Sequence, residues 1–181
     1  KSKYDVTVKQ LTEKIQAKKV GGALDESTEM GPLVAERQVK ALEIQVEDAQ
    51  AKGAKIVVGG KRPTRLTGAF YEPTLITNVT KDMKVWQEEV FGPVLPVVTF
   101  ETEEEAIELA NDTTYGLGSY VFTKDKVRME RVARQIQAGM VSQNNLTYLK
   151  PSNPFGGYKA SGLGREHGKY GFHDITQIKV V

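Results

Sequence analysis

Two adjacent carboxylates, Glu88 and Glu89, stand in the segment Gln87 to Val94 and are the first candidates for chemistry. Neighbouring carboxylates can serve as general acid and base, or can accept the two hydroxyl hydrogens of a sugar diol. The same pair can also be a charged turn ahead of a strand, because charged residues are common in turns. Composition alone favours the turn.

A glycine-rich stretch from Asn153 to Glu166 has the flexibility needed to cradle a phosphate. Its spacing differs from the dinucleotide-binding fingerprint, since Gly162, Gly164 and Gly168 form G-x-G-x-x-x-G and no strand leads directly into them. The P-loop pattern is not found either. Glycines in this arrangement indicate tight or left-handed turns, so we interpret the stretch as a structural loop.

Nucleophiles and metal ligands are scarce. The 181 residues include no cysteine and two histidines, His167 and His173. The chain therefore has no disulfide, no thiolate metal site and no cysteine nucleophile of its own. No G-x-S-x-G elbow is present for a serine nucleophile. We interpret both histidines as surface or hydrogen-bonding residues and expect no metal site.

The pair Asn144 and Asn145 follows a predicted strand at its carboxyl end. Open α/β sheets bind ligands at this position. The amides could orient a polar substrate or could cap the strand, and we favour capping.

The composition is that of an ordinary soluble protein, with 39% hydrophobic and 27% charged residues and a net charge of +2. One domain of this size can bury a core. Basic and acidic residues alternate along the helices, which disfavours nucleic-acid binding. No apolar run reaches the roughly 20 residues of a membrane span, and the first residues given do not have the pattern expected of a leader segment. We therefore expect no membrane contact and a cytoplasmic location.

The first half of the chain has helical and short extended segments. Apolar residues recur at helical spacing over about 4–19 and about 33–52. A short strand is predicted at 56–58. The segment 70–76 contains Pro73 and is predicted to be at best an irregular or edge strand.

The second half alternates strands and helices. Strands are predicted at 94–100, 119–122 and 140–144, with helices between them. Thr102 and Glu105 form a capping box at the start of the first of these helices. The alternation predicts one α/β domain with a mostly parallel twisted sheet covered by helices. The tail beyond this domain is β-prone, and such a terminal strand pairs with its own sheet or with that of another subunit.

Several segments occur in an order that resembles the aldehyde dehydrogenase superfamily, over essentially the whole chain. They include the E-x-F-G-P and P-F-G-G-x-K-x-S-G-x-G-R-E patterns, which are specific in combination. The segments are Met30–Leu33, Pro73–Leu75, Glu88–Val94, Ala110–Asp112, Tyr115–Leu117, Pro154–Lys159 and Ser161–Glu166. The resemblance implies that residues 1–172 are the C-terminal part of the catalytic domain and that 173–181 are an oligomerisation strand of a homodimer or homotetramer.

The resemblance also implies roles for individual residues. Glu89 matches the glutamate that holds the nicotinamide ribose of NAD or NADP, and Phe91 and Leu117 match residues beside the nicotinamide. Phe155 matches a residue of the aldehyde tunnel, and Asn144 begins a loop, 144–152, near its mouth. These expectations come from the family and not from spacing.

The family oxidises small aldehydes to acids through a cysteine thiohemiacetal, hydride transfer to the nicotinamide, and water activated by a glutamate. That cysteine, that general base and the Rossmann-type domain are expected upstream of Lys1, so we expect this chain alone to be inactive. An alternative is a non-catalytic binding or assembly module with the same fold. An enzyme with another nucleophile is disfavoured, because no serine or lysine has an evident base beside it.

Overall fold

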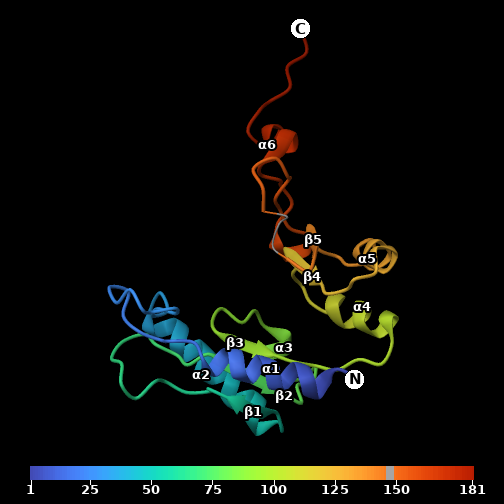
Figure 1. The fold of residues 1–181 in the computed structure, drawn as a ribbon. Helices are drawn as coiled ribbons and strands as arrows, with labels where there is room; N and C mark the ends of the chain where they lie inside the picture. Colours follow the sequence, from blue (N-terminus) through green and yellow to red (C-terminus); the bar gives the residue numbers. More distant parts are fainter. Residues whose placement is uncertain (146–148) are drawn as a thin grey trace. The chain divides into compact units, whose positions relative to one another are not determined.

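The computed structural model describes residues 1–145 and 149–181. The chain forms two compact units, Lys1–Phe100 and Glu101–Val181 (Figure 1). Each unit has its own small sheet. Within the described residues, every helix is too short or too polar to cross a membrane.

The first unit contains a three-stranded mixed sheet in the order β1-β2-β3. The antiparallel pair is β1 (Lys55–Val58) with β2 (Thr74–Thr77), and β2 runs parallel to β3 (Val94–Pro96). The prediction of an edge strand at 70–76 is wrong, because β2 is the central strand and all four of its residues are buried. Pro73 lies just before the strand, where its missing N–H removes no bond from the ladder.

Three helices accompany this sheet, namely α1 (Tyr4–Gln16), α2 (Glu36–Ala51) and the single turn α3 (Lys84–Gln87). Both long helices are somewhat shorter than their apolar patterns suggested. The core forms where α2 buries one face against the sheet and α3. Its main members are Val39, Leu42, Val46, Ala49, Tyr71, Ile76, Met83, Val85 and Val94.

The second unit pairs two parallel strands, β4 (Gly118–Val121) and β5 (Met140–Gln143), connected through α5 (Lys126–Ala133). Ahead of them lies α4 (Glu103–Asn111). The predicted cap of α4 is confirmed, since the Thr102 hydroxyl accepts the Glu105 N–H at 3.1 Å. The Glu105 carboxylate accepts the N–H of Glu101 and not that of Thr102. A short 3₁₀ turn, η1 (Lys159–Ser161), and α6 (Gly168–Asp174) follow.

The α/β class is confirmed, but the single mostly parallel sheet is not found among the described residues. The strands divide into sheets of three and two, and β3 and β4 belong to different sheets. Two of the three ladders are parallel. Alternation of strands and helices makes paired strands parallel, but it does not dictate that each strand pairs with the next one.

The C-terminal tail forms no ladder with the residues that the structure describes. The expected strand 173–181 begins inside α6, and residues 175–181 belong to no helix or strand. The side chains of Ile175, Ile178 and Val180 are exposed. A strand requires a backbone partner, so a role in oligomerisation stays a prediction.

Candidate functional site

The loop Glu88–Gly92 directly follows α3 and carries two of the predicted site residues. Val90 packs against the core, whereas the side chains of Glu89 and Phe91 are exposed. Phe91 exposes 64% of its surface. The loop therefore uses Val90 as its anchor and presents a carboxylate and an aromatic ring on either side of it.

Three residues of α2 hold this loop. The Gln45 amide donates to Glu88 Oε2 at 3.3 Å and to the Glu89 carbonyl at 3.2 Å, and the Gln38 amide donates to the Phe91 carbonyl at 3.0 Å. Between them, the Leu42 side chain lies so close to Gly92 that a Cβ there would overlap it. These α2 positions are spaced i, i+4 and i+7, so they share one face of the helix.

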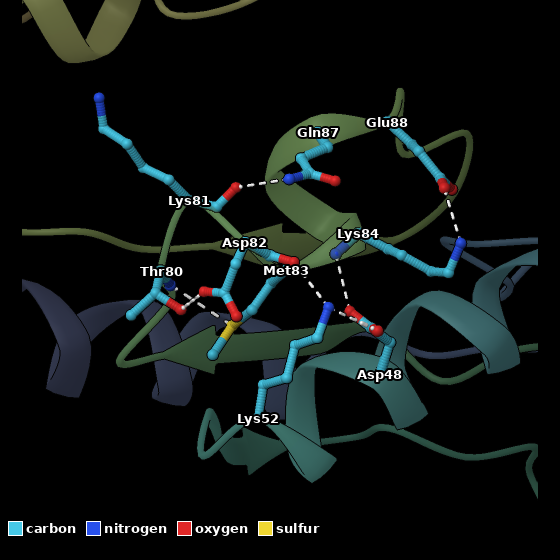
Figure 2. Close-up of polar contacts among 9 residues, drawn as sticks. All are labelled: Asp48, Lys52, Thr80, Lys81, Asp82, Met83, Lys84, Gln87 and Glu88. Carbon is cyan, nitrogen blue, oxygen red and sulfur yellow. Dashed lines mark hydrogen bonds and ion pairs between the residues drawn. The ribbon is translucent and has the colours of Figure 1, made fainter.

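The start of α3 is held by the same helix (Figure 2). The Lys84 N–H donates to Asp48 Oδ2 at 2.8 Å, so Asp48 satisfies one free donor of the α3 N-terminus from outside the segment. Lys52 pairs with Asp48 at 2.9 Å and donates to the Asp82 carbonyl at 2.6 Å. The hydrogen bond from Lys52 and then that from the Lys84 N–H lower the pKa of Asp48.

The two adjacent carboxylates have different environments. Glu88 pairs with Lys84 at 2.9 Å, and this hydrogen bond, followed by that from Gln45, lowers the pKa of Glu88. The Glu89 carboxylate has no hydrogen-bond or ion-pair partner within residues 1–145 and 149–181. Glu88 thus stabilises the turn through its bonds to Lys84 and Gln45. The Glu89 carboxylate stays exposed, as an acceptor suited to a diol.

In the second unit, Leu117 and Phe155 line a common cavity of about 870 Å³. Its wall is completed largely by the glycine-rich segment, including Arg165, and by Phe172 of α6. Leu117 is 42% exposed and Phe155 is half-buried. The structure therefore brings together these two predicted site residues.

The glycine-rich segment fixes the chain that leads to Leu117. The Gly116 carbonyl accepts the N–H of Tyr158 at 2.8 Å, and the Gly116 N–H donates to the Ser161 hydroxyl at 2.9 Å. The Lys159 ammonium donates to the carbonyls of Asn111 and Thr113 at 2.8 and 2.9 Å. The side chains of Lys159 and Ser161 therefore fasten the glycine-rich segment to the residues around Gly116.

Arg165 closes the glycine-rich segment on itself. Its guanidinium donates to the carbonyls of Gly157 and Gly164 at 2.9 and 2.8 Å and lies 5.5 Å from the Tyr158 ring centroid. Phe155 pairs with Glu166 in an antiparallel bridge. These contacts agree with the structural interpretation of the loop.

The Asn144 side chain bonds to Thr123, which lies just beyond β4. Its side chain accepts the Thr123 N–H at 3.0 Å and donates to the Thr123 carbonyl at 2.8 Å, and its backbone is left-handed with φ of 58°. The Asn144 side chain thus joins the end of β5 to the segment after β4, which differs from the expected cap of its own strand. Its place near the tunnel stays a prediction. Part of the predicted mouth loop, 146–148, lies outside the described residues.

The five predicted site residues fall into two groups, with Glu89 and Phe91 in the first unit and Leu117, Asn144 and Phe155 in the second. In the described parts of the chain, histidine and carboxylate side chains form no cluster suited to a metal. Sequence reasoning missed Gln38, Gln45 and Asp48. A signal was present, because Gln45 interrupts the apolar face of α2 next to Val46.

The chain is similar to aldehyde-oxidising enzymes over most of its length. It is 46% identical over 178 residues to mitochondrial succinate-semialdehyde dehydrogenase of Oryza sativa subsp. japonica, covering 98% of this chain and 34% of that enzyme. It is 45% identical over 179 residues to the Homo sapiens enzyme of the same name, with 98% and 33% coverage. The peroxisomal aminoaldehyde dehydrogenase 1 of Pisum sativum is 48% identical over 164 residues, with 90% and 33% coverage. The chain thus spans about a third of the length of these relatives.

The expectation of a cytoplasmic location is wrong. The relatives just described are named mitochondrial or peroxisomal. Targeting segments, and not the composition of a folded core, determine the compartment of a protein. The composition of this chain therefore does not indicate a compartment.

Solved structures agree with these relationships. Betaine aldehyde dehydrogenase from Staphylococcus aureus in complex with NAD+ superposes with a TM-score of 0.89 at 44% identity, covering 96% of this chain and 35% of that one. Succinate-semialdehyde dehydrogenase from Burkholderia pseudomallei gives 0.91 at 43% identity, with 95% and 36% coverage. The model of the aldehyde dehydrogenase family matches residues 1–181, and the chain belongs to that family.

Proposed function

We propose that this chain is the C-terminal part of the catalytic domain of an NAD(P)-dependent aldehyde dehydrogenase. The intact enzyme would oxidise a small aldehyde to a carboxylic acid. The exposed Glu89 carboxylate carries this proposal, because it projects from a firmly held loop and its oxygens are free to accept hydrogen bonds. A carboxylate accepts from both hydroxyls of a ribose, so Glu89 fits the nicotinamide ribose of NAD or NADP.

The remaining residues would position and shelter the reactants. Phe91 would lie beside the nicotinamide end of the cofactor, and Leu117 would border the ring. Phe155 would line the aldehyde tunnel, with Asn144 near its mouth. Relatives that act on succinate semialdehyde, aminoaldehydes and betaine aldehyde support a small aldehyde as the substrate.

The thiol nucleophile and the general base belong, in this proposal, to other residues of the intact enzyme, because these 181 residues contain no cysteine. The cofactor supplies the hydride acceptor when it is bound. The apolar residues of 175–181 would pair with another subunit in a homodimer or homotetramer, since they are exposed in the single chain.

The test is Glu89→Gln in the intact enzyme. The change keeps the shape but weakens the charged acceptor, so we expect hydride transfer to slow by about 10-fold to 100-fold. Single-turnover formation of NADH or NADPH measures this step. The matched control is Glu26→Gln, at an exposed position outside the loop, which should behave as wild type. The isolated chain should oxidise no aldehyde. An unchanged single-turnover rate in Glu89→Gln would refute the role of Glu89.

A further inference from the structure

Gln45 is a buried polar residue on the apolar face of α2, with 5% of its surface exposed. Its neighbours on that face, Leu42, Val46 and Ala49, are all core residues. Buried amides are nearly always hydrogen-bonded, because an unpaired one carries a desolvation cost. The partners of this amide are the two residues at the start of the exposed loop, 43 and 44 residues away in the sequence.

The amide fixes the main chain at Glu89. Its bond to the Glu89 carbonyl at 3.2 Å sets the orientation of the peptide plane that follows this residue. Its second bond, to Glu88 Oε2, fixes the preceding side chain, which Lys84 also holds. Asp48, one turn further along α2, secures the other end of the segment at the Lys84 N–H. The segment from Lys84 to Glu89 is therefore held by α2 at both ends.

The direction of the Glu89 carboxylate depends on this backbone. The side chain makes no hydrogen bond or ion pair of its own to the described part of the chain, so no polar contact of the side chain sets its direction. A carboxylate that must meet two hydroxyls gains most when its backbone is already in place, since small misplacements of binding groups slow chemistry steeply.

We propose that Gln45 is a positioning residue for Glu89, acting through the Glu89 carbonyl and the Glu88 carboxylate. The buried amide would hold the loop in the orientation that binds the nicotinamide ribose. This inference rests on the proposed function, and it adds a residue that touches neither cofactor nor substrate.

The experiment is Gln45→Met in the intact enzyme. Methionine has a similar volume but no donor, so the core stays filled while both bonds are lost. We expect a KM for NAD or NADP raised several-fold and single-turnover hydride transfer slowed by about 10-fold. Hydrolysis of an activated ester such as p-nitrophenyl acetate requires the thiol but no hydride transfer. Its rate should stay at the wild-type value, which a general loss of structure would not allow.

Two further variants complete the test. Gln50→Met makes the same change at an exposed position of α2 and should behave as wild type. Glu88→Ala removes one acceptor of Gln45 at a half-exposed site, so the fold should survive even if Gln45→Met does not fold. It should slow hydride transfer several-fold with ester hydrolysis unchanged.

The outcomes separate the two proposals. If Glu89→Gln leaves hydride transfer unchanged, the role assigned to Glu89 is wrong. If Glu89→Gln slows it while Gln45→Met and Glu88→Ala do not, the positioning role of Gln45 is overturned and that of Glu89 stands. Equal losses of ester hydrolysis and hydride transfer in Gln45→Met would also overturn it, because they would indicate a purely structural residue.

Discussion

The loop Glu88–Gly92 and the glycine-rich segment of the second unit are held in different ways. Side chains of α2 reach the first loop, with the Gln38 and Gln45 amides bonding to its carbonyls. The second is held by bonds between main-chain groups as well as by the side chains of Lys159, Ser161 and Arg165. Phe155 and Glu166 exchange two hydrogen bonds of 2.8 and 2.7 Å, and the Gly116 carbonyl accepts the N–H groups of both Gly139 and Tyr158.

This difference determines which substitutions each region tolerates. Contacts between backbones require close approach, which leaves no room for a Cβ. A Cβ at Gly139 or Gly156 would overlap a carbonyl oxygen of a neighbouring segment, whereas the atoms nearest to a Cβ at Gly92 belong to the buried side chain of Leu42. Substitutions in the first loop are therefore limited by side-chain packing, and those in the glycine-rich segment are limited by contacts between backbones.

The largest effect is expected for Gly139→Ala. The added methyl group would overlap the Gly156 carbonyl oxygen and approach the Gly157 Cα, and neither can move without displacing the loop. We expect a loss of more than about 3 kcal/mol in the stability of the second unit. Denaturant unfolding of the intact protein, followed by hydrogen exchange in peptides of β4 and β5, measures this loss.

The matched control is Gly31→Ala. A Cβ at Gly31 has nothing within 4 Å, and its φ lies outside the left-handed region. The same substitution should therefore change stability by less than about 1 kcal/mol. Equal effects of the two substitutions would show that backbone crowding does not distinguish the glycine-rich segment.

A smaller loss of stability is expected for Lys159→Met, which changes a side chain of the glycine-rich segment. Its ammonium joins the glycine-rich segment to the carbonyls of Asn111 and Thr113. Because this exposed site is partly screened by water, we expect a loss of about 1 kcal/mol, measured by denaturant unfolding. Lys124→Met, at an exposed position of the same unit, is the control and should have no measurable effect. A loss as large as that of Gly139→Ala would mean that side chains dominate here too.

Local patterns predicted the secondary structure well where the signal is itself local. The cap at Thr102 is set by residues three apart, and β1, β4 and β5 follow from short apolar runs. The centre of the first sheet was misjudged, because Pro73 suggested an edge although it precedes β2. Pairing depends on contacts between distant segments, so neither the two sheets nor the unpaired tail could be derived from periodicity.

The residues of the candidate site also differ in whether a local pattern or a distant contact identifies them. Glu89 and Phe155 belong to recognisable sequence patterns and were predicted. Gln45 and Asp48 were not, because their partners lie 36 to 44 residues away and only the fold shows that α2 lies along this segment. A buried glutamine in an apolar stripe is a weak signal that becomes meaningful only once its acceptors are known.

The smallest contribution of a single residue is expected for stability in acid. This stability should differ between the two units. Hydrogen bonds to the ionised form lower the pKa of seven carboxyl groups in the first unit, namely Asp25, Glu29, Glu36, Glu43, Asp48, Asp82 and Glu88. In the described part of the second unit, this holds for Glu103 and Asp125. The first unit therefore binds more additional protons when it unfolds in acid.

A carboxyl group with a lowered pKa stabilises the fold fully above its ordinary value, which is 3.8 for Asp48 and 4.5 for Glu88. This contribution is lost as the pH falls through the lowered value. We therefore expect hydrogen-exchange protection in peptides of α2 and β2 to fall below about pH 4.5, ahead of that in β4 and β5. High salt should reduce the difference, because exposed ion pairs are screened. Simultaneous loss of protection in both units would show that side-chain pairing does not set the acid stability of the first.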